Sequence, residues 1–169
     1  MAIAMPVVER HPNREGFRGV LTLVDVASDR APSGARGHRV VLTRKAAEEA
    51  LPSLLGMGLD YSPSFDRHDA RRKVGVITRA EIVGRSLELG GYLYAKDFPE
   101  IVREIGRPSL AASTRPRSQT SLGMSYEIAD AMVADLRSSI WTLTQVMFTG
   151  AAILRRDKAA YRETWIEME

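Results

Sequence analysis

The 169-residue sequence contains no cysteine and only three histidines. Without cysteine, the chain can form no disulfide framework, no cysteine-based zinc site and no thiol nucleophile. It also lacks a run approaching the roughly 18 consecutive apolar residues of a membrane-spanning helix. Its short apolar start has no basic segment and is followed by Glu9 and Arg10, so it does not resemble a signal peptide. We therefore expect a soluble, intracellular protein without a membrane partner.

A strong charge of either sign is also missing. Lysine and arginine number 24 and aspartate and glutamate 21, which leaves a formal charge of +3. This excess is too mild to indicate a nucleic-acid partner without a basic stripe. Arg115 and Arg117 lie in a basic segment, but it has no interleaved aromatic residues for stacking on bases. The composition therefore does not favour nucleic-acid binding.

The apolar pattern predicts short strands joined by hairpins, with few helices. Thr43 is a candidate N-cap for a helix over Lys45–Leu55, and a second short helix is expected after Asp97. Pro52 should kink or shorten the first helix. The strands are expected at residues 17–26, 38–42, 74–83, 87–95, 124–133, 140–148 and 150–154. This order lacks regular βαβ alternation and predicts an α+β fold, with a mainly antiparallel sheet or barrel flanked by short helices.

The length and composition favour one domain. We expect a flexible N-terminal arm at residues 1–16 and a single domain over residues 17–161. Within this domain, residues 107–121 are rich in Arg, Pro and Ser and predict a long mobile loop. Residues 162–169 are expected to form a C-terminal tail, although the wider segment 155–169 could equally be a helix or a docked segment.

The residues leave few options for chemistry. Three scattered histidines and no cysteine form no HExxH motif and no histidine pair at helical spacing, so no metal is expected. The glycines form neither a Walker motif nor GxGxxG, and no cofactor is expected. His11 lies in the polar arm, and His38 opens a strand after a glycine-rich loop. Both positions are typical of solvated or structural histidines.

His68 and Ser125 remain as a candidate base and nucleophile. Asp66 and Asp69 flank His68, and neighbouring carboxylates can hold a histidine in one tautomer. Ser125 begins an apolar strand just after Gly123, where a substrate backbone could approach closely. A charged surface loop and a serine in a turn would produce the same two patterns, so the residues alone leave both interpretations open.

Taken in order, the segments from Phe17 to Tyr161 resemble the prohead (capsid maturation) proteases of tailed bacteriophages. That family shares the fold of the herpesvirus assembly proteases. The resemblance depends on the order of several phrases rather than on one motif. They are LPSLLGMGLDYS, FDRHD with His68, KVGVITRAEI, LELGGYLYAKDFPEIVREI, LGMSYEI with Ser125, and FTGAAILRRDKAAY.

The resemblance implies a serine endopeptidase with His68 as the general base and Ser125 as the nucleophile. Backbone N–H groups around Gly123 and Met124 would contribute to an oxyanion hole. The expected substrate is the major capsid protein, the scaffold or the protease itself, cleaved inside the assembling procapsid in the host cytoplasm. The protease is expected to be a homo-oligomer and could be retained in the virion.

The sequence departs from the family pattern at two places. Thr149 stands where many members carry an acidic residue that orients the histidine. Ser125 is followed by Tyr126 rather than by glycine, which leaves Ser121 as the fallback nucleophile. The third member is therefore open, and a dyad without one is also compatible with the pattern. The missing acid also motivates an alternative function, that of an inactive structural or scaffolding capsid component. The candidates for the third member are Asp66, Asp69, Asp130, Glu127 and His38.

Overall fold

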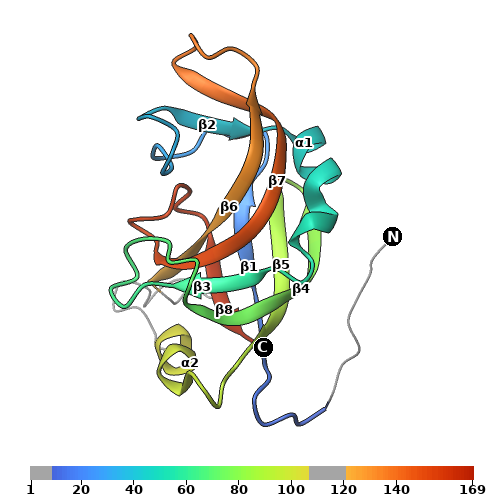
Figure 1. Cartoon of the computed structure of the whole chain (residues 1–169), viewed down its shortest axis with the longest axis vertical. Coiled ribbons are helices and arrows are strands. Elements are labelled where there is room, and N and C mark those ends of the chain that lie inside the picture. The colour runs from blue at the N-terminus through green and yellow to red at the C-terminus, as the bar shows by residue number, and fades with distance from the viewer. Residues whose placement is uncertain (1–8, 107–120) are drawn as a thin grey trace.

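The computed structural model describes residues 9–106 and 121–169, and Figure 1 shows them as a strongly curled sheet with two short helices. Residues 1–8 of the predicted arm and 107–120 of the predicted mobile loop lie outside the described residues. The elements are β1 (Glu15–Leu23), β2 (Arg39–Leu42), α1 (Arg44–Ala50), a 3-10 turn (Leu51–Leu54), β3 (Gly58–Tyr61), β4 (Lys73–Val83), β5 (Ser86–Leu93), α2 (Pro99–Gly106), β6 (Leu122–Val133), β7 (Ile140–Arg155) and β8 (Trp165–Met168). The α+β class predicted from the sequence is confirmed.

The described strands form one eight-stranded mixed sheet in the order β2-β7-β3-β4-β5-β1-β8, with β6 paired to β7 outside this path. The hairpin of β4 and β5 and the pairs β5–β1 and β6–β7 are antiparallel, as expected. Two pairs differ from that expectation, because β2 and β3 both run parallel to β7. Strand β7 is long enough for both to pair along one edge while β6 occupies the other edge.

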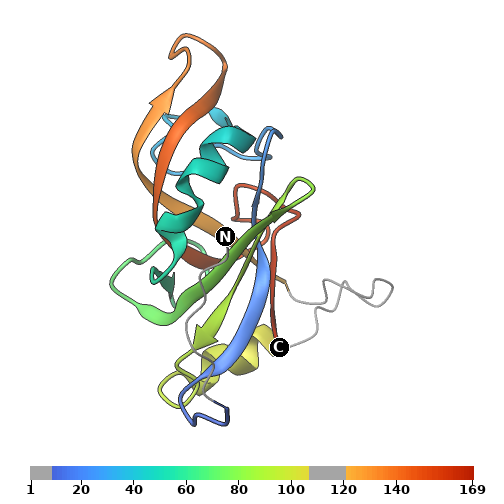
Figure 2. The same cartoon turned by 90° about the vertical axis from the view of Figure 1, so that its right-hand side faces the viewer.

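Local sequence signals account for the first helix. Thr43 Oγ1 accepts a hydrogen bond from the N–H of Ala46 at 3.1 Å, so the predicted N-cap is confirmed. The α-helix ends at Ala50, earlier than predicted, and continues as the 3-10 turn. Pro52 lacks an N–H and disfavours a continued α-helix, which explains the early end. Figure 2 shows α1 lying across β7.

The last residues belong to the sheet rather than to a separate tail. Strand β8 pairs antiparallel with β1, and Ile166 is fully buried in the main core. Tyr161 is also buried, and its hydroxyl donates to the carbonyl of Val26 at 2.9 Å. These contacts stabilise the C-terminal segment against the first strand. No helix in the described ranges has the length and apolar character needed to cross a membrane.

The register around β7 positions the candidate site. On β7, Ala152 lies between Asp60 of β3 and Ser125 of β6, and each of them is its direct register partner. Partners across neighbouring strands project from the same face of a sheet. Gly150, two residues earlier on β7, is the partner of Glu127. The two small residues of β7 therefore leave room for polar side chains from the strands on both sides.

Candidate active site

Strand β6 separates its side chains into a core face and a polar face. Leu122 and Met124 are buried in the core, and Tyr126 packs edge-on against Phe148. Because strand side chains alternate, Ser125 and Glu127 project together from the opposite face. Ser125 is nearly buried, and Glu127 is partly exposed. The candidate nucleophile thus has a carboxylate beside it on the same strand.

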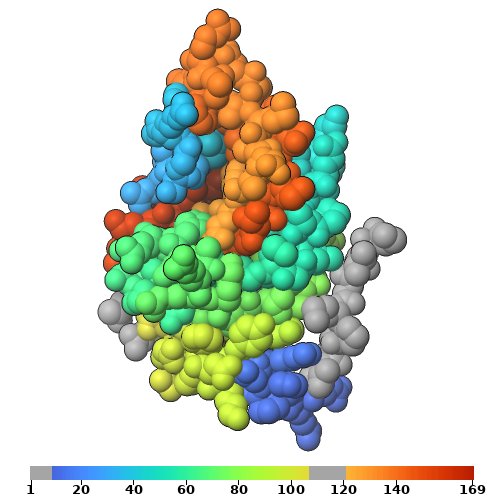
Figure 3. Space-filling model, in the orientation of Figure 1, coloured from blue at the N-terminus to red at the C-terminus, as the bar shows by residue number. Residues whose placement is uncertain are grey.

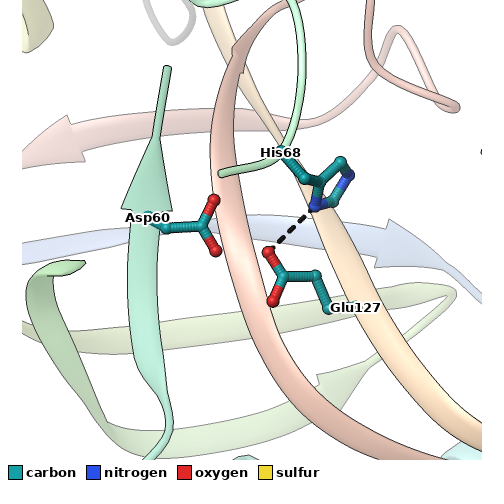
Figure 4. Close-up of side chains that lie close together, drawn as sticks. All are labelled: Asp60, His68 and Glu127. Carbon is teal, nitrogen blue, oxygen red and sulfur yellow. Dashed lines mark hydrogen bonds and ion pairs between the residues drawn. The ribbon is translucent and has the colours of Figure 1, made fainter. Parts of the chain in front are cut away.

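His68 lies in the loop between β3 and β4 and contacts this face. Its Nδ1 is 3.0 Å from Oε1 of Glu127, and both side chains are largely buried (Figure 4). Because a carboxylate can only accept, Nδ1 carries the proton in this hydrogen bond. In a neutral imidazole, this leaves Nε2 unprotonated and able to accept a proton. Glu127 therefore fixes the tautomer that a general base requires.

Thr149, where the family resemblance led us to expect an acid, lies in an irregularity of β7. Between the pairs Glu127–Gly150 and Ile128–Phe148 the register of β7 skips one residue, so Thr149 is the extra residue of a β-bulge. Its side chain is exposed. A Cβ on Gly150 would lie 2.7 Å from Oε2 of Glu127, so the carboxylate occupies the space that glycine leaves free. The acid comes from β6 and lies over β7.

Asp60 is the second acid near His68. Its side chain is fully buried, and Oδ1 accepts the backbone N–H of Asp69 at 3.0 Å. The ammonium group of Lys73 lies 3.8 Å from Oδ2. Figure 4 shows the carboxyl groups of Asp60 and Glu127 pointing toward each other. One buried acid thus contacts both the histidine loop and the strand that bears Ser125.

The two acids have opposite pKa shifts. Burial, together with the hydrogen bond to Glu127 and its negative charge, raises the pKa of Asp60 to about 7. Burial also opposes ionisation of Glu127, but hydrogen bonds from His68 and Asp60 outweigh it and lower its pKa to about 2. Two adjacent carboxyl groups cannot both ionise easily. Between these values Glu127 carries the charge and Asp60 keeps its proton.

A cavity of about 900 Å³ opens beside these residues. His68, Ser125 and Glu127 line it together with the loop at residues 31–36 and the indole of Trp141. Figure 3 shows the hollow between this loop, the β6–β7 hairpin and the loop that carries His68. Its size and its mixture of apolar and polar walls suit a bound peptide segment or small molecule.

The structure does not place the other candidates for a third member against His68. The carboxylate of Asp66 accepts from the hydroxyl of Ser62 at 3.0 Å, and that of Asp69 pairs with the guanidinium of Arg72. Asp130 is exposed on β6. His38 stacks on Trp141 with 4.3 Å between ring centroids, and its Nδ1 bonds to the carbonyl of Ser139.

The N-terminal histidine and the fallback serine also lie elsewhere. Nδ1 of His11 accepts from the N–H of Asn13 at 3.1 Å, a local turn contact. Ser121 is exposed just before β6, where its carbonyl accepts from the N–H of Arg156. Among the described residues, Ser121 is not part of the cavity wall that includes Ser125. The geometry therefore favours Ser125 over Ser121.

The predicted oxyanion donor Met124 needs correction. Its N–H is donated to Oγ1 of Thr164 at 3.1 Å, and its side chain is buried in the core. Gly123 allows Thr164 to approach, since a Cβ there would lie 2.5 Å from Oγ1. An added Cβ on Gly123 would also lie 3.3 Å from Cγ of Arg156, whose buried Nε has no hydrogen-bond partner among the described residues. Within the described part of the chain, one N–H donor of this guanidinium group thus lies beside β6 without an acceptor.

Asp60, His68 and Glu127 also offer ligand atoms within 4.8 Å of one another. Such a set could contact a cation, but its members already bind one another and the backbone. Oε1 of Glu127 accepts from His68, and Oδ1 of Asp60 accepts from Asp69. We therefore interpret the group as a hydrogen-bonded array rather than as a metal site.

Comparison with solved structures finds proteases of Kaposi's sarcoma-associated herpesvirus. A complex with a hexapeptide phosphonate inhibitor is 12% identical, with a TM-score of 0.49, over 90% of this chain and 64% of the other. Complexes with an allosteric inhibitor and with a dimer disruptor are 16% identical, with TM-scores of 0.47, over 90% of this chain and 75% of theirs. This chain thus spans less than two thirds of the first protease. No family model and no curated protein matches the sequence.

The herpesvirus likeness is too distant to carry an argument about the chemistry of the site. The more specific resemblance to bacteriophage prohead proteases stays a prediction.

Sequence reasoning singled out His68 and Ser125, named Glu127 among several acids, and missed Asp60. The available signal was a lone carboxylate inside the apolar run of β3, between Leu59 and Tyr61. A charged residue in such a run is rarely buried without a specific partner. That partner is Glu127, which is 67 positions away in the chain and is brought close only by the pairing of β3 and β6 with β7.

The replacement Asp60→Asn should flatten the pH dependence of stability between about pH 4 and pH 7. Folded Asp60 keeps its proton to about pH 7, whereas the unfolded carboxyl loses it near its ordinary pKa of 3.8. The folded state therefore binds more protons in this window, and the free energy of unfolding falls as pH rises. Glu127 has the opposite effect at lower pH, between about 2 and 4.5.

Urea denaturation at several pH values measures these slopes for the wild type and the variant. Asp130→Asn makes the same chemical change on an exposed residue and should keep the wild-type slope. Equal slopes for wild type and Asp60→Asn would contradict the assignment of the buried proton.

The replacement Gly150→Ala should separate Glu127 from His68, because the new methyl group would lie 2.7 Å from Oε2 and 3.3 Å from the carbonyl of Gly58. We expect loss of the downfield proton resonance of the hydrogen-bonded Nδ1–H of His68 in NMR spectra. Thr149→Ala, at the exposed bulge residue, is the matched control and should keep the resonance. An unchanged spectrum for Gly150→Ala would show that the carboxylate does not depend on this space.

Proposed function

We propose that the protein is a serine endopeptidase with Ser125 as the nucleophile, His68 as the general base and Glu127 as the acid that orients the base. One observation carries this proposal. Nδ1 of His68 bonds at 3.0 Å to a carboxylate two residues from Ser125 on the same strand face, and all three side chains line one cavity. A serine, a histidine and a carboxylate that orients the histidine thus line one cavity. The proposal requires Nε2 of His68 to come within hydrogen-bond reach of Oγ of Ser125 when a substrate is bound.

The chemistry follows from the tautomer. Oγ of Ser125 would attack the carbonyl carbon of a peptide bond while Nε2 of His68 takes its proton. The imidazolium would then donate this proton to the leaving amine. Water would next give a proton to Nε2 and attack the acyl carbon, and the C–O bond to Oγ would break as Nε2 returns the proton to Ser125. Glu127 stays ionised throughout, because its pKa of about 2 lies far below neutral pH. Its charge stabilises the imidazolium that forms transiently.

The geometry weakens the alternative of an inactive structural component. That alternative was motivated by Thr149, which stands where an acid was expected. Glu127 supplies an acid to His68 from the neighbouring strand, over the space that Gly150 leaves open. The lack of an acid at Thr149 therefore gives no reason to expect an inactive protein.

The biological role follows from the sequence resemblance. We propose cleavage of the major capsid protein, the scaffold or the protease itself during maturation of a bacteriophage procapsid, within the host cytoplasm. A homo-oligomer is part of the same proposal. The cavity, bounded by the loop at residues 31–36 and by β6, is where the chain to be cleaved would lie.

The test is processing of a capsid protein coexpressed with the protease in bacteria. Ser125→Ala and His68→Ala should abolish the trimmed N-terminus detected by intact mass. Glu127→Gln should lower the rate by about 10²–10⁴, because the amide no longer holds the required tautomer. A fluorophosphonate probe should label the wild type at Ser125, and labelling should be lost in Ser125→Ala.

Ser121→Ala is the matched control and should keep both labelling and processing. Trimming of the capsid protein to the same N-terminus by Ser125→Ala or His68→Ala would overturn the proposal. A folded wild-type protein that neither reacts with the probe nor trims the capsid protein would favour the structural alternative.

A further inference from the structure

Asp60 is a buried acid to which the proposed reaction gives no role. Its carboxyl group is fully buried, and among the described residues no donor lies within hydrogen-bond distance of Oδ2. Burying such an acceptor without a donor is costly. The geometry around this oxygen therefore needs an explanation.

The group that faces Asp60 is another acceptor. The carboxylate of Glu127 points toward it, and its Oε1 already accepts from His68 (Figure 4). The ammonium group of Lys73 lies 3.8 Å from Oδ2, and the side chain of Lys73 is partly exposed. Two carboxylates at this place would repel each other across a water-poor interior. A single proton held between them turns the repulsion into a hydrogen bond.

We propose that Asp60 is a positioning residue of the site, acting as a neutral carboxyl group that donates a hydrogen bond to Glu127 while its other oxygen holds the loop of His68. The inference deepens the proposed function, on which it rests for its consequence in catalysis. Glu127 would then be held by His68 on one side and by Asp60 on the other. The carboxylate stays ionised and aimed at the imidazole.

The connections of Asp60 fit this role. Oδ1 accepts from the N–H of Asp69, the residue that follows His68, so the loop and the strand are held by one side chain. In the sheet, Asp60 and Ser125 are both register partners of Ala152. The small side chain of Ala152 lets the acid on β3 reach across β7 toward the polar face of β6. Loss of Asp60 would therefore loosen both the base and its orienting acid.

The charges around Asp60 support a proton at this position. Glu127 from β6 disfavours ionisation, and Lys73 from β4 and His68 from the loop favour it. Ala152, the register partner from β7, carries no charge. Burial and Glu127 prevail, and the pKa of Asp60 rises to about 7. An Asn side chain reproduces the neutral form, since its amide donates where the carboxyl O–H does and its oxygen accepts the N–H of Asp69.

The experiment compares Asp60→Asn and Asp60→Ala in the full chain. Cleavage of a peptide spanning the capsid processing site is measured from about pH 5.5 to pH 9. We expect Asp60→Asn to stay within about threefold of the wild type at pH 6 and to lose the decline that deprotonation of Asp60 causes above about pH 7. Asp60→Ala should lower kcat by about 10- to 100-fold, by analogy with the loss seen when residues that orient metal ligands are replaced. Asp130→Asn is the matched control and should keep the wild-type profile.

The outcomes separate two roles of Asp60. If Asp60 acts as an ion paired with Lys73, Asp60→Asn will lose as much activity as Asp60→Ala, and the proposal is overturned. If both variants keep the wild-type kcat and pH profile, Asp60 does not position the site. A folded Asp60→Asn variant keeps the test decisive where Asp60→Ala fails to fold.

A second measurement does not depend on peptidase activity. In ¹³C-labelled wild-type protein, the side-chain carboxyl carbon of Asp60 should titrate near pH 7, and that of Glu127 should not titrate above about pH 3. Titration of Asp60 in the ordinary acid range would contradict the shared proton even in an active enzyme. The expected titration in a protein without peptidase activity would support the carboxyl pair and refute only the proposed function.

Discussion

The hydrogen bond between His68 and Glu127 is the contact on which the rest of the candidate site depends. It joins a loop between two strands to a strand almost sixty residues later in the chain. It also selects the imidazole tautomer, because only Nδ1–H can donate to the carboxylate. The unprotonated Nε2 that results can accept a proton, which is the property that the proposed reaction requires of this histidine. Without this contact, His68 would be one more polar residue in a charged loop.

The contact requires small residues in β7, the strand between the two acids. Gly150 and Ala152 project from the site face of β7, and their small size lets acids from β3 and β6 meet above it. The bulge at Thr149 sets the register that aligns Gly150 with Glu127. A polar cluster is thus built on a sheet whose other face is packed with apolar side chains. The cost of burying acids is offset by the hydrogen bonds among them and with the backbone.

Much of the fold follows from local pattern. The hairpin of β4 and β5 comes from two apolar runs around a short turn that contains Gly84, and Thr43 caps α1 as expected. The parallel pairs β2–β7 and β3–β7 could not be predicted, because they join segments far apart in the chain that carry no mark of their partner. The same holds for β8, whose short mixed sequence becomes a strand only because β1 presents a free edge.

By itself, the sequence determined which residues were available for chemistry. With no cysteine and three histidines, serine was the remaining nucleophile of interest, and His68 stood out by its acidic neighbours. Only the tertiary structure decided which acid forms a hydrogen bond with it. Asp66 and Asp69 lie close to His68 in the chain yet bond to Ser62 and Arg72. Glu127 instead bonds to His68, and Asp60 bonds to its loop, because the register of β7 brings their strands together. Side-chain direction is set by strand pairing, and pairing between distant strands is a property of the folded sheet rather than of any local stretch of sequence.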